Sequence, residues 1–120
     1  MIIRFWEQFN KGNLEVINEC FSENFVRYAK DGTTMDREGY SKFCTRVLNM
    51  ASDIQIKIED IVAEGDKVAF YFTLSGTRKD EAKENFPTSK RFTMSEAYFS
   101  RFENGKIVEF RNFQAQRQTE

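Results

Sequence analysis

The sequence predicts an α+β fold in which three N-terminal helices pack against a strongly curved antiparallel β-sheet. Apolar residues recur at helical spacing up to residue 51, and after Ser52 they recur at every second position, as in half-buried strands. The expected strands are joined by short turns, which makes chain neighbours antiparallel. Helices that precede a run of strands define the α+β class and must cover one face of the sheet.

Three helices are expected before residue 52. The apolar residues of segment 2–10 follow the i, i+3, i+4, i+7 pattern, and Gly12 ends this helix. Asn13 is the candidate N-cap of a second helix, and residues 25–35 predict a short extended segment with a turn. Asp36 is the candidate N-cap of a third helix that ends near residue 50. The apolar stripes of the second and third helices are Leu14, Ile17 and Phe21, and Tyr40, Phe43, Cys44, Val47, Leu48 and Ala51.

The strands are expected over residues 53–62, 67–76, 91–102 and 107–114. In the first of them the alternation slips at Asp60, where a bulge would help the sheet to curve. Residues 64–66 and 103–106 are turn sequences. The charged segment 77–90 holds the single proline of the chain and is predicted to be a loop.

Length and composition restrict the function classes. The chain has 120 residues, which fits one domain over 1–120, and its net charge of −1 includes no basic block. A nucleic-acid partner is therefore not expected. No apolar run approaches the roughly 20 residues that span a bilayer, so no membrane partner is expected either. Cys20 and Cys44 lack a paired spacing and read as small core residues in a reducing compartment, which suggests a cytoplasmic location.

The absence of histidine is the most informative feature of the composition. It removes Ser-His-Asp and Cys-His nucleophile systems. Two separated cysteines without histidine do not supply the usual zinc or iron ligands, so no metal and no cofactor are predicted. Acid–base chemistry would have to come from Asp, Glu, Tyr, Lys or water.

The last predicted hairpin places polar residues on its apolar face. Glu96 lies between Met94 and Tyr98 at the same parity, and Asn112 and then Gln114 follow Phe110. An unpaired buried carboxylate is energetically costly, so Glu96 is expected to be paired with another group, to be neutralised by protonation, or to be in contact with water. One interpretation is a pocket wall with a carboxylate for acid–base work. The other is a structural ion pair with one of the arginines Arg4, Arg27 and Arg111.

Four segments together resemble a known family. They are "RFWEQFNKGNLEVINECFSENFV", "IEDIVAEGDKVAFYFTLSGT", "PTSKRFTM" and "RFENGKIVEFRNF". In this order and spacing they resemble the SnoaL-like polyketide cyclases, within the superfamily of nuclear-transport-factor-two and ketosteroid isomerase folds. The resemblance implies a cone, in which a curved antiparallel sheet of about four to six strands wraps the three helices around a blind pocket. It also implies a small hydrophobic ligand and a homodimer formed through the outer face of the sheet.

The resemblance and the alternation together suggest site residues. Glu96 and Tyr98 are the catalytic candidates, with Glu96 as base and a tyrosine hydroxyl as a donor to a substrate oxygen. The candidate substrate-binding residues are Trp6, Tyr28, Phe70, Phe72, Phe110 and Asn112. Glu109 and Arg111 alternate with the inward set and are interpreted as an outward pair.

The sequence departs from the machinery of both families. The cyclases commonly carry an aspartate near the end of the last strand, where this chain reads "RNFQAQRQ". Phe5 and Ala29 stand nearest to the tyrosine and aspartate of the ketosteroid isomerases. Three functions therefore stay open: a cofactor-free cyclase or isomerase that uses Glu96, a non-catalytic ligand-binding protein, and a dimerisation module.

Overall fold

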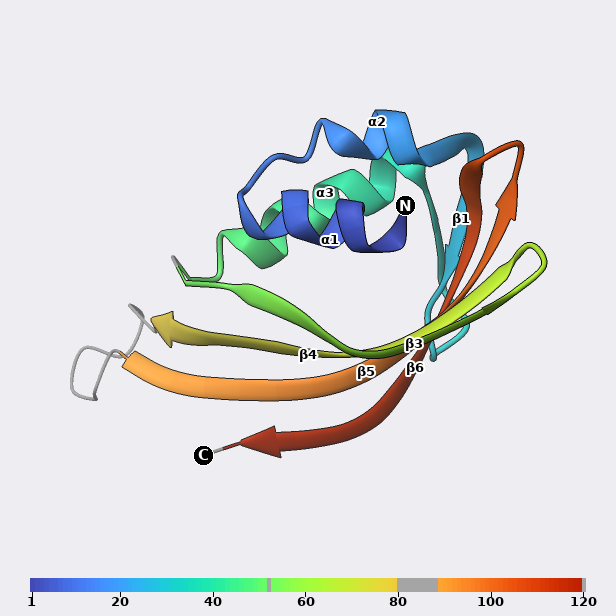
Figure 1. Ribbon diagram of the computed structural model, residues 1–120. Coiled ribbons are helices and arrows are strands. Elements are labelled where there is room, and N and C mark those ends of the chain that lie inside the picture. Colours follow the sequence, from blue (N-terminus) through green and yellow to red (C-terminus); the bar gives the residue numbers. More distant parts are fainter. Residues whose placement is uncertain (52, 80–88, 120) are drawn as a thin grey trace.

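The computed structural model describes residues 1–51, 53–79 and 89–119, and it confirms the α+β class. The elements are α1 (Ile2–Asn10), α2 (Val16–Cys20), β1 (Phe21–Tyr28), β2 (Thr34–Asp36), α3 (Arg37–Leu48), β3 (Gln55–Glu64), β4 (Lys67–Lys79), β5 (Ser89–Glu103) and β6 (Lys106–Thr119). All three helices lie on one face of the sheet (Figure 1). No helix in the described part of the chain is both long and apolar enough to cross a membrane.

The helices largely follow the sequence pattern, but the second helix needs two corrections: its N-cap residue is Glu15 and not Asn13, and its end differs from the prediction. Asp36 caps α3 as expected, because its Oδ1 accepts a hydrogen bond from the Gly39 backbone N–H at 2.8 Å. The second helix is shorter than predicted, and Phe21 is already extended as the first residue of β1. Phe21 is fully buried. The helical spacing from Ile17 to Phe21 was misleading, since a buried residue at i+4 fits the end of a helix and the start of a strand equally well.

In the described part of the chain the sheet has six strands in the order β2-β1-β6-β5-β4-β3. Strands β3 to β6 form antiparallel pairs, as does β1 with β2. The prediction of a wholly antiparallel sheet was wrong for one pair, because β1 runs parallel to β6. Short turns determine the direction only of strands that are consecutive in the chain, whereas β1 reaches β6 through a long connection that also permits parallel pairing.

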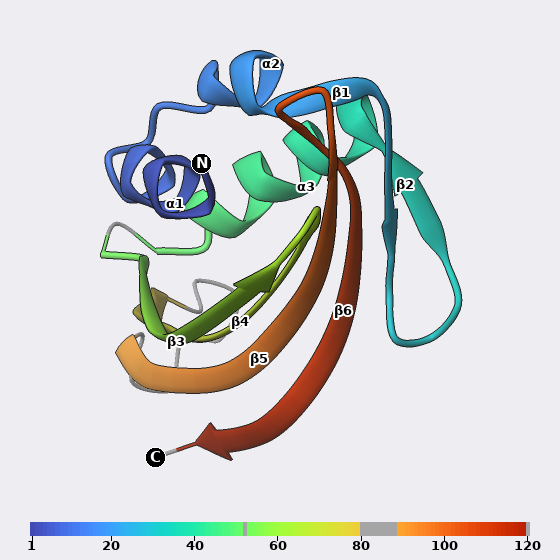
Figure 2. The ribbon, with the colours of Figure 1, turned by 45° about the vertical axis from the view of Figure 1, so that its right-hand side comes forward.

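The strand lengths differ from the prediction at the charged segment. Residues 77–79 belong to β4 and residues 89–90 to β5, while residues 80–88 of the predicted loop lie outside the described residues. The register shift between Ile58 and Asp60 confirms the predicted bulge in β3. Strands β5 and β6 bend along their length below the helices in Figure 2. The sheet is open, with β2 and β3 at its two edges.

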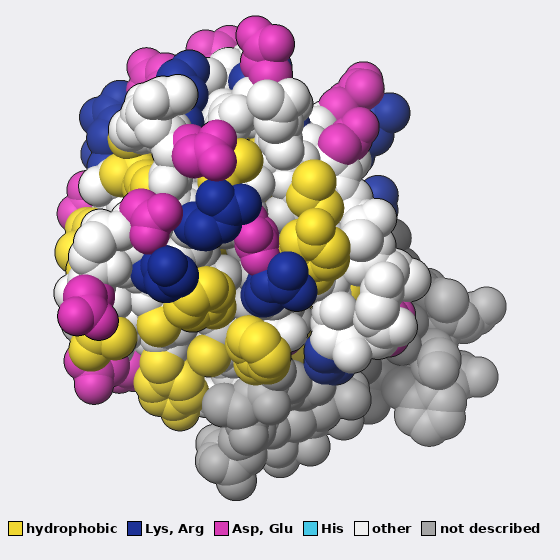
Figure 3. Space-filling view, turned by 90° about the vertical axis from the view of Figure 1, so that its right-hand side faces the viewer, with side chains coloured by type: hydrophobic (Ala, Val, Ile, Leu, Met, Phe, Trp, Pro, Cys, Tyr) yellow, Lys and Arg dark blue, Asp and Glu magenta, His cyan; other side chains and the backbone are white. Residues whose placement is uncertain are grey.

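The two faces of the sheet differ in composition. The inner face and the helices bury a mainly aromatic core, whose largest fully buried side chains are Tyr40, Phe5, Phe9, Phe21, Phe25 and Phe110. Cys20 and Cys44 are buried free thiols, as predicted. The other face leaves large apolar side chains exposed, namely Val62, Tyr71 and Phe113. Figure 3 shows hydrophobic side chains beside basic and acidic ones on the side of the molecule that lies to the right in Figure 1.

Candidate functional site

A cavity of about 350 Å³ lies inside the fold, between the helices and the inner face of the sheet. It has the size and the mainly apolar lining of a small-molecule site. Helices α1 and α3 and strands β1 and β3 to β6 contribute to its wall. The lining residues are Trp6, Phe9, Arg27, Lys30, Tyr40, Phe43, Cys44, Val47, Met50, Ile56, Phe72, Leu74, Met94, Glu96, Tyr98 and Asn112.

The structure brings most of the sequence-predicted site residues together at this cavity. Trp6, Phe72, Glu96, Tyr98 and Asn112 line it. Phe70 and Phe110 do not line it and instead pack behind the wall. The Phe110 ring stacks on that of Tyr98 at 4.5 Å, and the Phe70 ring lies 5.6 Å from that of Tyr98.

Tyr28 is the exception among the predicted substrate-binding residues. Its ring is not part of the cavity wall and lies 4.2 Å from the guanidinium carbon of Arg111. Successive side chains of a strand point to opposite faces, and in β1 the neighbouring Arg27 takes the inward position. The expectation of Tyr28 in the pocket is therefore corrected, and Arg27 stands where Tyr28 was expected.

Glu96 and Asn112 form a polar pair in the wall. The Asn112 Nδ2 donates a hydrogen bond to Glu96 Oε1 at 3.0 Å, and Asn112 is buried while Glu96 is half-buried. Among the described residues only Asn112 bonds to the Glu96 carboxylate. Arg4 pairs with Glu19 and Arg111 pairs with Glu109, so neither arginine neutralises Glu96. The amide orients the carboxylate and leaves it without a counter-charge from these two residues.

Two tyrosines supply hydroxyl groups to the cavity. The Tyr40 and Tyr98 hydroxyl oxygens are 3.3 Å apart and both side chains are buried. Burial raises the pKa of Tyr98 to about 12 and raises the pKa of Tyr40 well above its usual value. Both hydroxyls are therefore protonated at neutral pH and serve as hydrogen-bond donors rather than bases. Burial also raises the pKa of the Cys44 thiol to about 12, which makes a thiolate nucleophile at this position unfavourable.

Aromatic rings give the cavity a flat wall. The indole of Trp6 is inclined by 9° to the ring of Tyr98 and by 26° to that of Phe72. Tyr98 and Phe72 are inclined by 27° to each other at a centroid distance of 5.6 Å. Three nearly parallel rings favour a flat apolar molecule, because such a molecule can stack against rings without exposing polar surface.

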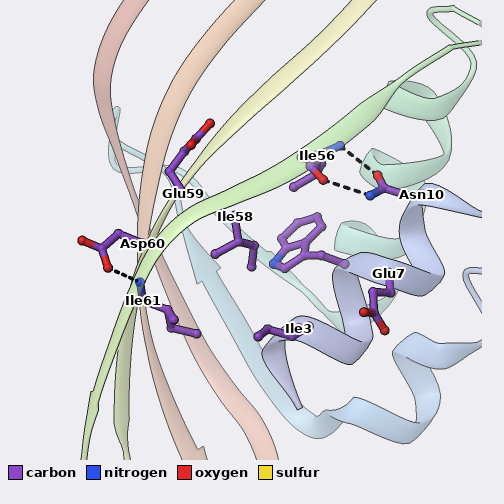
Figure 4. Close-up of a pocket in the computed structure, with 9 residues that line it drawn as sticks. Ile3, Glu7, Asn10, Ile56, Ile58, Glu59, Asp60 and Ile61 are labelled. Atoms are coloured by element: carbon purple, nitrogen blue, oxygen red, sulfur yellow. Dashed lines mark hydrogen bonds between the residues drawn. The ribbon is translucent and has the colours of Figure 1, made fainter.

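A second hollow of about 400 Å³ lies outside the cavity, between α1 and the edge strand β3. We call it the α1–β3 groove. In Figure 4 the Asn10 amide bridges the backbone of Ile56, with hydrogen bonds of 2.9 and 2.8 Å, and thereby covers part of the free edge of β3. The carboxylates of Glu59 and Asp60 point away from Ile3 and Ile58 in the same view.

Three of the four polar side chains that line the α1–β3 groove, Asn10, Glu59 and Asp60, already have hydrogen-bond partners. Glu59 accepts a hydrogen bond from the Thr73 hydroxyl at 2.9 Å, and Asp60 accepts one from the Ile61 backbone N–H at 2.9 Å. The interior cavity, by contrast, gathers a carboxylate, a guanidinium, an amide and two hydroxyls on an apolar wall. Convergent polar groups are what distinguish a ligand site from a surface depression, so the interior cavity is the candidate site.

Comparisons with known proteins agree with this architecture. The α+β fold with helices on one face of an open mixed sheet is also that of a putative polyketide cyclase and of a protein with a ketosteroid isomerase-like fold. A family model described as SnoaL-like polyketide cyclase matches residues 1–116, and the chain belongs to this family. A search of curated proteins found no match.

Solved structures show the same fold. IdmH, a putative polyketide cyclase from Streptomyces antibioticus, is 28% identical with a TM-score of 0.80, covering 93% of this chain and 87% of that chain. AclR, a putative hydroxylase from Streptomyces galilaeus, is 24% identical with a TM-score of 0.78, and the match covers 95% of this chain and 85% of that chain. A putative SnoaL-like polyketide cyclase from Jannaschia sp. CCS1 is 16% identical with a TM-score of 0.78, covering 93% and 81%.

Sequence reasoning missed several cavity residues, of which Arg27 is the most consequential. Phe25 and Arg27 share one parity in β1, and Phe25 is 1% exposed. Had segment 21–28 been recognised as a strand, that parity would have placed Arg27 on the buried face. Tyr40 and Phe43 were expected on the stripe of α3, but no pattern indicated that this stripe faces a cavity.

Proposed function

We propose that this chain binds a small hydrophobic molecule in its interior cavity and acts on it as a cofactor-free cyclase or isomerase. The observation that carries the proposal is the position of Glu96. It is a half-buried carboxylate in an apolar aromatic wall, oriented by an amide and not paired with Arg4 or Arg111. Membership of the SnoaL-like family and the bend of β5 and β6 support a cone-shaped sheet around this cavity.

The proposed reaction begins at a carbon next to a ligand carbonyl. The Glu96 carboxylate removes a proton from that carbon, so that a carboxylic acid and an enolate form together. The Tyr98 or Tyr40 hydroxyl donates a hydrogen bond to the enolate oxygen. In a cyclisation the enolate carbon then bonds to a second carbonyl carbon of the same molecule, and the alkoxide so formed takes up the proton. In an isomerisation Glu96 returns the proton to another carbon.

The alternative is a non-catalytic member of the same family that binds a ligand or serves as a dimerisation module. The specific observation in its favour is the stretch "RNFQAQRQ", which lacks the aspartate found near the end of the last strand in the cyclases. In the ligand-binding form of this alternative a ligand enters the cavity and leaves unchanged, whereas a dimerisation module binds no ligand. The catalytic and the ligand-binding functions differ in what Glu96 does, and they agree on where the ligand binds.

Ligand binding is tested by filling each hollow separately. Val47 lines the interior cavity and Ile61 lines the α1–β3 groove. We expect Val47→Phe to weaken the binding of 2-naphthol roughly tenfold or more, because the added ring occupies ligand space. Ile61→Phe is the matched control and should leave the affinity unchanged. Isothermal titration calorimetry gives both constants, and a loss only in Ile61→Phe would assign the ligand to the groove instead.

Proton transfer is tested by deuterium exchange. The probe is 2-tetralone in D₂O, and NMR follows exchange at the carbons beside the carbonyl above the buffer rate. We expect Glu96→Gln to lower the protein-dependent rate roughly 100-fold or more, since an amide cannot take the proton. Glu7→Gln changes an exposed carboxylate of the groove and should keep the full rate. Binding without exchange in the unmodified protein favours the non-catalytic alternative.

We further propose that the chain forms a homodimer through the outer face of the sheet. Two neighbouring rows of paired positions carry apolar side chains there: Tyr71, Ala97 and Phe113, and Val62, Ala69 and Phe99. Val62 and Phe113 are 65% and 55% exposed. Val62→Lys combined with Phe113→Lys should yield monomers in light-scattering measurements, because charges oppose burial of this face.

The free thiols of Cys20 and Cys44 support a cytoplasmic location.

A further inference from the structure

We infer that Arg27 is an anion-binding residue of the cavity and that the ligand is a flat apolar molecule carrying a carboxylate. This inference rests on the proposed binding of a ligand in the interior cavity, and it adds the chemical class of that ligand. It requires no acid–base role for Glu96 and holds equally for a non-catalytic binding protein.

Arg27 is a buried cation. Its side chain leaves the inner face of β1, lines the cavity and belongs to a residue that is only 7% exposed. Arginine stays protonated at neutral pH even when it is buried. The fold therefore holds a full positive charge beside an apolar space, where an unpaired charge is costly.

The hydrogen-bond donors of Arg27 are poorly satisfied within the described residues. Its Nε is buried and has no hydrogen-bond partner, and one terminal nitrogen reaches only the Met35 sulfur at 3.9 Å, a weak acceptor. No described carboxylate forms an ion pair with it. Other arginines of the chain are paired, as in Arg4 with Glu19 and Arg101 with Glu109. Arg27 thus has five N–H donors, of which the buried Nε lacks a partner, and the acceptors that its guanidinium meets among the described side chains are the Tyr98 hydroxyl and the Met35 sulfur.

Aromatic rings hold the guanidinium in place. Its central carbon lies 4.7 Å from the ring centre of Phe43 and 5.9 Å from those of Tyr40 and Tyr98. Ring faces attract a cation, but they do not replace the oxygen acceptors that its N–H groups require. These three rings therefore position a charged group whose buried Nε has no acceptor among the described residues, so that an acceptor for it must come from solvent or from a ligand.

The charges around the cavity favour an anion. Among the described residues of its wall Arg27 and Lys30 are cationic and Glu96 is anionic, so these residues together carry a net charge of +1. The second buried donor without a partner in the described part of the chain, Trp6 Nε1, also belongs to a residue of the wall. A planar guanidinium matches a carboxylate through two parallel hydrogen bonds. The flat aromatic wall accommodates the rest of such a molecule.

The test compares two flat probes that differ in charge, anthraquinone-2-carboxylate and its neutral amide, anthraquinone-2-carboxamide. Trp6 is the single tryptophan of the chain and lines the cavity, so its fluorescence reports binding, and calorimetry gives an independent constant. In the unmodified protein we expect the carboxylate to bind more tightly than the amide. In Arg27→Met the carboxylate should bind roughly 10- to 100-fold more weakly, while the affinity for the amide changes little.

Two further variants complete the design. Arg46→Met is the matched control, because Arg46 is exposed and contacts the Phe43 ring at 5.9 Å without lining the cavity. It should retain the preference for the carboxylate. Arg27→Lys keeps the positive charge and should retain part of the preference for the carboxylate. This variant therefore separates the effect of losing the charge from the effect of losing the fold. Circular dichroism checks the fold of each variant.

The outcomes distinguish this inference from the proposed function. If neither probe binds the unmodified protein, the cavity is not a site for flat molecules and both ideas fail. If both probes bind and Val47→Phe weakens both, but Arg27→Met does not reduce the preference for the carboxylate, the cavity remains a ligand site and the role of Arg27 is overturned.

Discussion

Charged side chains among the described residues are paired on the outer face of the sheet and not on its inner face. On the outer face Glu109 accepts hydrogen bonds from both Arg101 and Arg111, so the charges there satisfy one another. On the inner face Arg27 and Glu96 line the same cavity, yet no ion pair joins them. Opposite charges that are kept apart in an apolar space remain available to a third group. This contrast is one reason for the proposal that the inner polar residues bind a ligand, whereas the outer ones form ion pairs with one another.

Aromatic residues on the two faces of the sheet differ in how far they are exposed to water. Phe110 on the inner face is fully buried and stacks on Tyr98, whereas Phe113 in the same strand is 55% exposed on the outer face. Burial in a close-packed core stabilises the fold through both transfer from water and packing. The inner rings therefore do two things, since they stabilise the fold and form or support the cavity wall.

The largest expected effect compares these two phenylalanines. Phe110→Ala should lower the free energy of unfolding by about 3 to 5 kcal/mol, because it leaves a hole in the aromatic core. Phe113→Ala should cost less than about 1 kcal/mol, because the ring is half in water already. Urea denaturation at low protein concentration measures both values. Equal losses in the two variants would contradict the distinction between the inner and outer faces.

Much of the fold followed from the sequence because each element carried a clear local pattern. The helical spacing of α1, the Asp36 cap of α3 and the slip at Asp60 are all local signals, and the structure confirms each of them. The parallel pairing of β1 with β6 was not predictable in this way. It depends on which surfaces meet after the chain has folded back, and no local pattern encodes it.

The candidate site was predictable only where polar residues interrupted an apolar face. Glu96 and Asn112 stood out because a carboxylate and an amide are unusual at inward positions of a hairpin. Arg27 did not stand out, since an arginine in a short segment is ordinary until that segment is known to be a strand with Phe25 facing inward. The cavity itself depends on the distance between α3 and the sheet, which a single sequence does not specify.

The next effect concerns pH and the inner hydroxyls. Burial raises the pKa of Tyr98 to about 12, so the folded state keeps a proton that the unfolded state loses at lower pH. The stability that this tyrosine contributes is complete below its unfolded pKa and is lost as the pH rises towards 12, at roughly 1 kcal/mol per pH unit. Tyr98→Phe should flatten this part of the stability curve. The measurement is urea unfolding between pH 8 and about 11.5.

Tyr71 provides the matched control for that curve. Its ring is on the outer face and 38% exposed. Tyr71→Phe should therefore leave the steep alkaline loss of stability in place. If both variants show the same slope as the unmodified protein, the alkaline loss of stability arises from groups other than Tyr98.

The smallest effect concerns the stability cost of Arg27. A buried guanidinium without an ion pair opposes folding, whereas a methionine fills similar space without a charge. Three ring contacts partly offset this cost, so we expect Arg27→Met to raise the free energy of unfolding by about 1 kcal/mol. Arg46→Met, at an exposed position, should stay within about 0.5 kcal/mol of the unmodified protein. Thermal and urea unfolding without ligand give both values.

A loss of stability in Arg27→Met alone would mean that the guanidinium serves to hold Tyr40, Phe43 and Tyr98 in place. A gain in stability accompanied by weaker binding of the carboxylate probe is the pattern that selection for a ligand, rather than for the fold, produces.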